Sequence, residues 1–185
     1  MDFKDLVAKV GAENLTYGDL LLTKEWQERR LQILQKDDNY CTECGLSATV
    51  WYEGKLISFD KNNFLDIEYD GERITADSPV TLEKNVYLHV HHKFYVRGRL
   101  PWEYQDEELT TLCNWCHWEL HKTVKIKIFQ ETEKILEELN YYVCERCHGA
   151  GVFPEFSHVH DGICFRCNGA RYEELIGKPK SNWIK

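Results

Sequence analysis

Eight cysteines form four Cys-x-x-Cys pairs, which is the strongest chemical signal in the chain: Cys41/Cys44, Cys113/Cys116, Cys144/Cys147 and Cys164/Cys167. Two thiolates on one tight turn can reach the same ion, and two such turns complete a tetrahedral zinc site. Disulfides are the alternative in an exported protein. However, the opening residues MDFKDLVAKVGAEN lack the basic start and continuous apolar stretch of a signal peptide. In a reducing cytosol we therefore expect two structural zinc ions.

Four histidines supply a second kind of chemistry. His91 and His92 end the apolar stretch VYLHVHH, and His117 and His121 lie four residues apart in a stretch expected to be helical. Adjacent strand residues point to opposite sides, so His91 and His92 can divide two roles, one on a metal ion and one on water. Phosphodiester hydrolysis needs both an activated water and positive charge near the developing negative charge. We therefore expect a metal-centred site with a histidine base.

The position of the second cysteine pair bears on this site. Cys113/Cys116 lies directly before His117, and pairing it with Cys41/Cys44 would hold the helix near the histidine strand. An alternative is that His117 or His121 is a spare ligand of the cysteine zinc. Four cysteines already complete that site, which weakens this alternative.

Hydrophobic periodicity predicts the elements that position these residues. Helices are expected over residues 2–10, 23–36, 109–124 and 126–140, and a strand over residues 86–92. Thr23 is a candidate N-cap. Residues 49–85 are rich in β-branched and aromatic residues, and Asp70-Gly71 is a hairpin-type turn. We expect a β-hairpin insertion here, whose acidic residues form a solvated face rather than a binding surface.

Residues 141–176 contain an internal repeat. The segments CERCHGAG (144–151) and CFRCNGAR (164–171) share the frame C-x-R-C-x-G-A-x. The glycine after each pair permits the left-handed backbone that such turns need. The four thiolates suffice for one closed zinc site, so His148, His158 and His160 are expected to be bystanders. The tail, residues 177–185, is expected to be mobile.

Composition narrows the function classes. The hydrophobic content is 43%, the formal net charge is −8, and apolar runs are far too short to cross a membrane. The charge argues against a protein that coats nucleic acid but permits a nuclease, in which a metal supplies local positive charge. A cytoplasmic protein with no membrane association is expected.

The stretch from Trp26 to about His121 resembles the HNH endonuclease family, which has the ββα-metal fold. The residues that carry the resemblance are ERRLQILQKDDNYCTEC, LHVHHKFY, GRLPWEY and LTTLCNWCHWELH. The resemblance implies cleavage of DNA phosphodiester bonds with one divalent metal ion (Mg²⁺, Mn²⁺, Ni²⁺ or Zn²⁺). It implies that His92 is the general base and that the metal ligands are His91, His117 and His121. It also implies a structural zinc at Cys41, Cys44, Cys113 and Cys116.

Two departures from the family pattern stand out. The position of the middle Asn, which braces the loop through backbone hydrogen bonds, is Glu108 here, and a carboxylate accepts but cannot donate as an amide does. The segment between Cys44 and the histidine strand is also longer than in many members. Basic residues around the expected metal could contact phosphates and set register rather than sequence: Lys93, Arg97, Arg99, Lys122 and Lys125.

The C-terminal repeat resembles the C-x-x-C-x-G-x-G zinc fingers of DnaJ-type chaperones. Residues 144–151 match fully, whereas residues 164–171 carry Arg171 where the last glycine should be. This resemblance implies a zinc ribbon at Cys144, Cys147, Cys164 and Cys167, with a partner protein as one candidate ligand.

The sequence thus predicts a small, zinc-stabilised α+β protein. Residues 1–140 are expected to form the nuclease domain, with N-terminal helices, an insertion at 49–85, a ββα-metal core at 86–125 and a following helix at 126–140. The zinc ribbon is expected at 141–176. The expected function is metal-dependent DNA cleavage. The alternatives are a non-catalytic zinc module that binds DNA or protein, and a purely structural or chaperone-like zinc protein. The oligomeric state is left open.

Overall fold

The computed structural model describes residues 1–15, 17–69, 72–132, 135–153, 156, 159 and 162–177. The chain divides into two compact units. The first comprises Met1–Gln32, His92–Leu109 and Trp118–Lys185, and the second comprises Ile33–His91 and Thr110–His117. No helix in the described part of the chain is long and apolar enough to cross a membrane. The proposed division at residue 140 stays a prediction.

The N-terminal helices are α1 (Phe3–Val10), α2 (Tyr17–Leu21) and α3 (Lys24–Lys36), which confirms the helices expected at 2–10 and 23–36. The side chain of Asp2 accepts a hydrogen bond from the backbone N of Asp5 at 2.8 Å and so caps α1. Thr23 is 1% exposed, and its Oγ1 accepts from the backbone N of Trp26 at 3.3 Å. The predicted N-cap of α3 is therefore confirmed.

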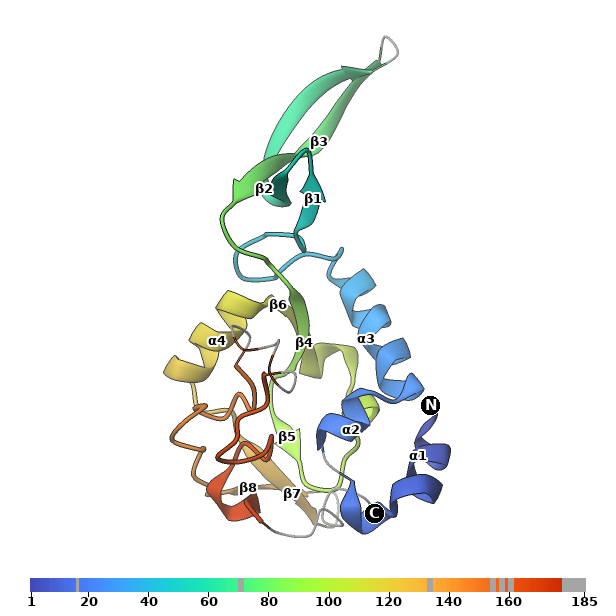
Figure 1. Cartoon of the computed structure of the whole chain (residues 1–185), viewed down its shortest axis with the longest axis vertical. Coiled ribbons are helices and arrows are strands. Elements are labelled where there is room, and N and C mark those ends of the chain that lie inside the picture. Colours follow the sequence, from blue (N-terminus) through green and yellow to red (C-terminus); the bar gives the residue numbers. More distant parts are fainter. Residues whose placement is uncertain are drawn as a thin grey trace. The chain divides into compact units, whose positions relative to one another are not determined.

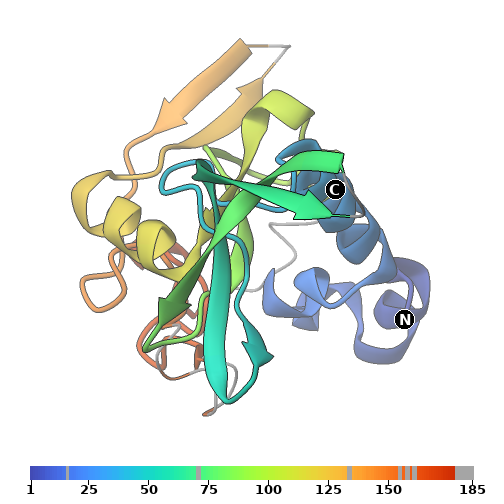
Figure 2. The same cartoon turned by 90° about the horizontal axis from the view of Figure 1, so that it is seen from above.

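The core of the first unit lies where α1 and α2 meet three short strands. Strand β5 (Tyr95–Val96) pairs in parallel with β7 (Ile128–Thr132), which pairs antiparallel with β8 (Ile135–Leu139) (Figure 2). The buried residues of this core come from segments far apart in the sequence: Leu15, Tyr17, Leu20, Tyr95, Ile126, Ile128, Tyr172 and Leu175. Burial of these apolar side chains is the main stabilising term for the unit.

The helix predicted at 126–140 is wrong, because this segment forms β7 and β8. Ile126 and Ile128 are 5% and 1% exposed, while Lys125 and Lys127 are exposed. This alternation has the period of two that belongs to a strand, not the helical period. Pairing of Tyr95 with Ile128 and of Val96 with Phe129 satisfies the backbone and overrides helix propensity.

The second unit contains the expected hairpin. Strands β1 (Val50–Tyr52), β2 (Lys55–Tyr69) and β3 (Glu72–Leu82) form one antiparallel sheet in the order β1-β2-β3 (Figure 1). The register shifts between Asp60 and Phe64, as at a β-bulge. The hairpin predicted within 49–85 is confirmed, whereas Asp70-Gly71 lie outside the described residues.

Two strands and a helix carry the histidines. Strand β4 (Leu88–His92) forms a two-stranded sheet with β6 (Leu109–Cys113), and helix α4 (Asn114–Thr123) follows β6 directly. The strand expected at 86–92 is present from Leu88. The helix expected at 109–124 is wrong for its first five residues, because the β-branched and buried segment LTTLC pairs as a strand. The side chain of Asn114 accepts from the backbone N of Tyr87 at 2.9 Å and marks the start of α4.

The rest of the first unit is loop-like. Short 3₁₀ helices occupy Pro101–Glu103, Asp106–Glu108 and Glu173–Leu175. Isolated bridges join Val143 to Tyr172 and Val152 to Ile163. Of the expected mobile tail, residues 178–185 lie outside the described residues, as do His158 and His160.

Replacement of the buried N-cap of α3 tests this part of the fold. Thr23→Ala should lower the free energy of unfolding by about 1 kcal/mol, because the amide of Trp26 loses its acceptor. Urea denaturation measures the change. Thr81→Ala, at an exposed position of β3, is the control and should have a smaller effect. Equal midpoints for the two variants would contradict the capping role.

Candidate metal centres and active site

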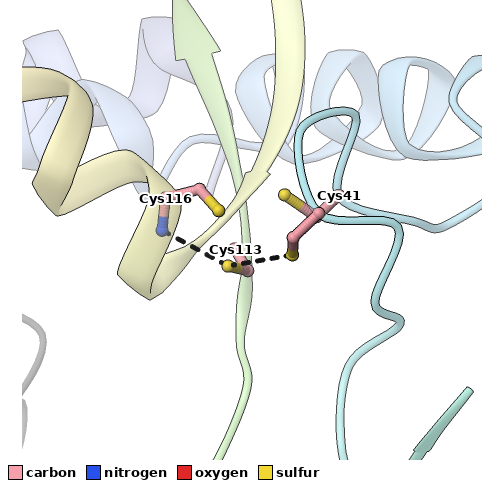
Figure 3. A group of neighbouring side chains, drawn as sticks. Cys41, Cys113 and Cys116 are labelled. Atoms are coloured by element: carbon pink, nitrogen blue, oxygen red, sulfur yellow. Dashed lines mark hydrogen bonds between the residues drawn. The ribbon is translucent and has the colours of Figure 1, made fainter. Parts of the chain in front are cut away.

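The first group of four cysteines lies in the second unit. Cys41 and Cys44 come from the turn after α3, Cys113 ends β6, and Cys116 lies in the first turn of α4. The side chains of Cys41, Cys113 and Cys116 point toward one another (Figure 3). All four Sγ atoms lie within 4.8 Å of one another, and Cys44 Sγ lies 3.8 Å from Cys113 Sγ. The sequence-predicted set is therefore brought together.

The second group lies in the first unit and is more deeply buried. Cys144, Cys147, Cys164 and Cys167 are each 2% exposed or less. The Sγ atoms of Cys144 and Cys164 are 4.0 Å apart, and those of Cys147 and Cys167 are 3.7 Å apart. The backbone links the two turns in both directions: Cys164 N donates to Gly151 O at 2.9 Å, and Cys144 N donates to Arg171 O at 2.8 Å.

The sulfur spacing fits zinc in both groups. A tetrahedral site with zinc–sulfur bonds of about 2.3 Å has sulfur–sulfur edges of roughly 3.8 Å. A disulfide would need a sulfur–sulfur bond of about 2.05 Å, and all eight cysteines are free thiols. Burial raises the pKa of the Cys116 thiol to about 12, whereas a hydrogen bond with Cys113 lowers the pKa of Cys41 to about 4. With sulfur atoms at this spacing, each group could hold a zinc ion.

Histidines gather at β4 and α4. Within the second unit, His91 Nδ1 lies 3.1 Å from His117 Nε2. Metal–nitrogen bonds of about 2.0–2.1 Å place neighbouring ligand nitrogens roughly 2.9 Å apart in octahedral geometry and about 3.4 Å apart in tetrahedral geometry. The observed distance falls between these values. His89, two residues before His91, stacks on His117 with ring centroids 5.6 Å apart.

Helix α4 carries the third predicted metal ligand. His121 follows His117 by one helical turn on the same face. Burial is the main cause that lowers the pKa of His121 to about 4, and Arg171 lowers it further. A hydrogen bond with the backbone of His148 acts in the opposite direction. The imidazole is therefore neutral near pH 7, which is the form that binds metals.

His92 occupies an aromatic pocket of the first unit and is 3% exposed. Its ring stacks on Trp26 and on Tyr95, with centroid distances of 5.2 and 5.5 Å, and meets the edge of Tyr104 at 4.5 Å. Its Nε2 lies 3.0 Å from the backbone O of Pro101. A carbonyl oxygen only accepts, so Nε2 carries the proton and Nδ1 keeps its lone pair. Burial lowers the pKa of His92 to about 3, so the ring is neutral.

Glu108 braces the loop between His92 and β6. Its carboxylate accepts from the backbone N of Gln105 at 2.7 Å and pairs with Arg99 at 3.2 Å, while its backbone O accepts from Lys93 N at 2.9 Å. Arg29 of α3 donates to Tyr104 O at 2.8 Å from the other side. Glu108 thus makes acceptor contacts of the kind expected of it, and it holds the loop that supplies Pro101 and Tyr104.

The predicted DNA-binding residues differ in their surroundings. Lys93, Lys122 and Lys125 are exposed, and Arg97 is partly buried. Lys122 pairs with Glu119 at 3.2 Å. Arg99 is engaged by Glu108 and lies 5.0 Å from the ring centre of Tyr104, so its contacts are those of a loop brace.

Several residues near the histidines were missed by sequence reasoning. His89 could have been found, because it shares a strand face with His91 by spacing. Arg171 was noticed as a departure from the glycine pattern, yet its contacts could not be foreseen. Its guanidinium lies 4.3 Å from the ring centre of Tyr17 and 5.2 Å from that of Tyr95. The expected bystander His148 is exposed and is not a member of the second cysteine group.

Metal analysis tests the cysteine groups. The purified protein should contain two tightly bound zinc ions per chain, measured by inductively coupled plasma mass spectrometry, as the two groups imply. A strong chelator should abolish the native circular dichroism spectrum, since metal binding contributes to the free energy of folding. Cys113→Ser and Cys147→Ser should each lose one zinc ion, and each serves as the control for the other. A chelated protein with an unchanged spectrum would contradict both sites.

The described residues therefore offer two kinds of metal-ligand set, one of cysteines and one of histidines. The cysteine groups offer closed coordination, whereas three histidines leave positions open for water or substrate oxygens. Comparison of the chain with family models, with curated proteins and with solved structures finds no match. What supports a function is thus the chemistry of these groups and the neutral histidine beside them.

Proposed function

We propose that the protein is a metal-dependent endonuclease of the HNH type, which hydrolyses DNA phosphodiester bonds. The observation that carries this proposal is the pairing of two kinds of histidine on β4. His91 lies 3.1 Å from His117 in a group that could hold a metal ion, whereas the next residue, His92, is neutral and held in a separate aromatic pocket. The order β4, β6, α4 supports a ββα-metal core, and the paired C-terminal turns support a zinc ribbon.

His92 acts as the general base in this proposal. Its Nε2 proton is held by the backbone O of Pro101, which leaves Nδ1 to accept the proton of an attacking water. Stacking against Trp26 and Tyr95 fixes the ring plane, so little reorganisation is needed. A phosphodiester anion bound nearby raises the pKa of a histidine, which would make His92 a stronger base in the complex than in the free protein.

His91, His117 and His121 would hold the divalent metal through neutral imidazole nitrogens. When bound, such an ion supplies a Lewis acid for the phosphate oxygens and for the leaving group. His89 stacks on His117 and limits the orientations of that ring. The first cysteine group fixes the start of α4, because Cys116 directly precedes His117. Its zinc would therefore position a ligand rather than take part in the reaction.

Glu108 and the basic residues complete the proposal. Glu108 acts as a positioning residue, since its contacts with Gln105 N and Arg99 hold the loop that binds His92 Nε2. Lys93 and Arg97 follow His92, and Lys122 and Lys125 follow His121, so these side chains are the proposed phosphate contacts. With a net charge of −8, affinity for DNA should be modest and sensitive to salt.

A non-catalytic zinc module that binds DNA or protein is the second candidate. The deep burial of His92, which is 3% exposed, favours it, because a buried imidazole also serves as a packing residue. In a module of this kind, the protein would need two zinc ions and no further metal. A third, exchangeable metal ion is therefore the feature that separates the two candidates.

Cleavage of supercoiled plasmid with added Mg²⁺, Mn²⁺ or Ni²⁺ tests the proposal. Wild-type protein should nick the plasmid. His92→Ala and His92→Gln should reduce the rate by about 10²–10⁴-fold, the usual contribution of a general base. The glutamine variant keeps a donor for Pro101 O but has no basic nitrogen.

A variant of the metal group is the matched control. His117→Ala should lose both cleavage and the third metal, whereas His92→Ala should lose cleavage and keep the metal, as titration calorimetry would measure. Both variants should retain two zinc ions. Cleavage by His92→Ala at the wild-type rate would remove His92 from the mechanism. A folded, zinc-loaded wild type that neither cleaves nor binds a third metal would favour the module.

A further inference from the structure

Arg171 occupies a glycine position in the second zinc-binding turn. In the internal repeat it corresponds to Gly151, and the two backbones agree: φ is 77° at Gly151 and 69° at Arg171. The carbonyl of each accepts from the first cysteine of the other turn. Positive φ is strained for a residue with a side chain, and such strain is found most often where a side chain has a function.

The side chain of Arg171 extends into the aromatic pocket of the first unit. Its guanidinium lies over the rings of Tyr17 and Tyr95, at 4.3 and 5.2 Å. Gly151 makes room for it, since a Cβ on Gly151 would lie 3.1 Å from Arg171 Cγ. Among the described side chains, Arg171 Nε is one of the buried polar atoms that have no hydrogen-bond partner. A guanidinium in such a place has donors to offer to an incoming anion.

The same pocket contains the proposed base. Tyr95 stacks on His92 at 5.5 Å and carries Arg171 near its ring, and Tyr17 contacts both His92 and the guanidinium. The ribbon also approaches His121, because a Cβ on Gly149 would lie 3.8 Å from His121 Nδ1. The C-terminal turns therefore place the Arg171 guanidinium close to the rings around His92. They also place the backbone at Gly149 close to His121.

We propose that Arg171 binds a DNA phosphate beside His92, so that the C-terminal zinc ribbon supplies part of the nuclease site. This inference rests on the proposed function for the location of the bound phosphate. A guanidinium fork suits phosphate because two parallel N–H groups can bind two oxygens at once. A cation that served packing alone would also stack on Tyr17 and Tyr95, but it would not add a charge to DNA binding.

The test uses variants that keep the turn intact. Arg171→Gly restores the residue of the first repeat and is compatible with the left-handed backbone, and Arg171→Lys keeps the charge but loses the fork. Arg146→Ala is the matched control, because Arg146 is an exposed ribbon arginine that lies 5.8 Å from the ring centre of Phe153. Circular dichroism and zinc content should match the wild type in all three variants.

Two measurements are made on each variant. The first is kcat/KM for plasmid nicking, which should fall about ten- to a hundredfold in Arg171→Gly, as for the loss of one charge-assisted hydrogen bond. It should also fall in Arg171→Lys and stay unchanged in Arg146→Ala. The second is the salt dependence of binding to a fluorescein-labelled DNA duplex, in a His92→Gln background without added divalent metal. The slope of log K against log salt should decrease by about 0.9 in Arg171→Gly alone.

The outcomes separate this inference from the proposed function. A salt slope in Arg171→Gly equal to that of the parent protein would overturn the role of Arg171, whether or not the wild type cleaves DNA. A reduced slope together with a reduced cleavage rate would support it. Absence of nicking by the wild type would overturn the proposed nuclease instead, and the binding measurement would still decide whether Arg171 contacts phosphate.

Discussion

The close packing of four cysteine thiols in each group is the constraint on which the rest of the structure depends, because four such thiols repel one another once they ionise. In each group the sulfur atoms lie within 4.8 Å of one another, and burial removes the water that would screen their charges. A divalent cation bound by such a group would turn this repulsion into attraction, and tetrahedral coordination would then fix the turns that carry the ligands. In the second unit, such an ion would tie the turn after α3 to the junction of β6 and α4. The orientation of α4, and hence of His117, follows from that connection.

Burial also determines the charge of the histidines. The aromatic rings around His92 exclude water, which disfavours the imidazolium and keeps the ring neutral. The cost is that a strongly depressed pKa makes a weak base. In the proposed mechanism, His92 therefore gains basicity only when an anion is bound nearby. The brace formed by Glu108 and Arg99 belongs to the same arrangement, because it holds the loop whose carbonyl fixes the tautomer of His92.

Local chemistry made several features predictable from the sequence. The spacing of the cysteines predicted both metal groups, Thr23 predicted the cap of α3, and β-branched residues predicted the hairpin. Prediction failed where pairing partners lie far away in the chain. Residues 126–140 have enough apolar residues for a helical face, but Ile128 pairs with Tyr95, and a contact across that distance has no local signal. Likewise, the segment LTTLC was expected as helix because its pairing with β4, a strand that the sequence did predict, has no local signal.

The aromatic pocket around His92 could not be predicted from the sequence for the same reason, because its residues come from distant segments. Trp26 belongs to α3 and Tyr104 to the loop after β5, and their convergence on His92 depends on the folding of three separate segments. His89 followed from strand alternation and was overlooked. The contacts of Arg171 required knowledge of which core the ribbon packs against, which is a property of the tertiary structure.

The two C-terminal cysteine turns, at 144–151 and 164–171, are alike in backbone and unlike in side chains. Gly151 and Arg171 occupy equivalent places, yet the absence of a side chain at the first provides the space that the second fills. The two turns therefore share one backbone conformation but differ in role. The turn with Gly151 leaves a space, and the Arg171 side chain of the other turn fills it. A repeated turn can serve as a scaffold in this way, since the two copies share one backbone conformation while their side chains differ.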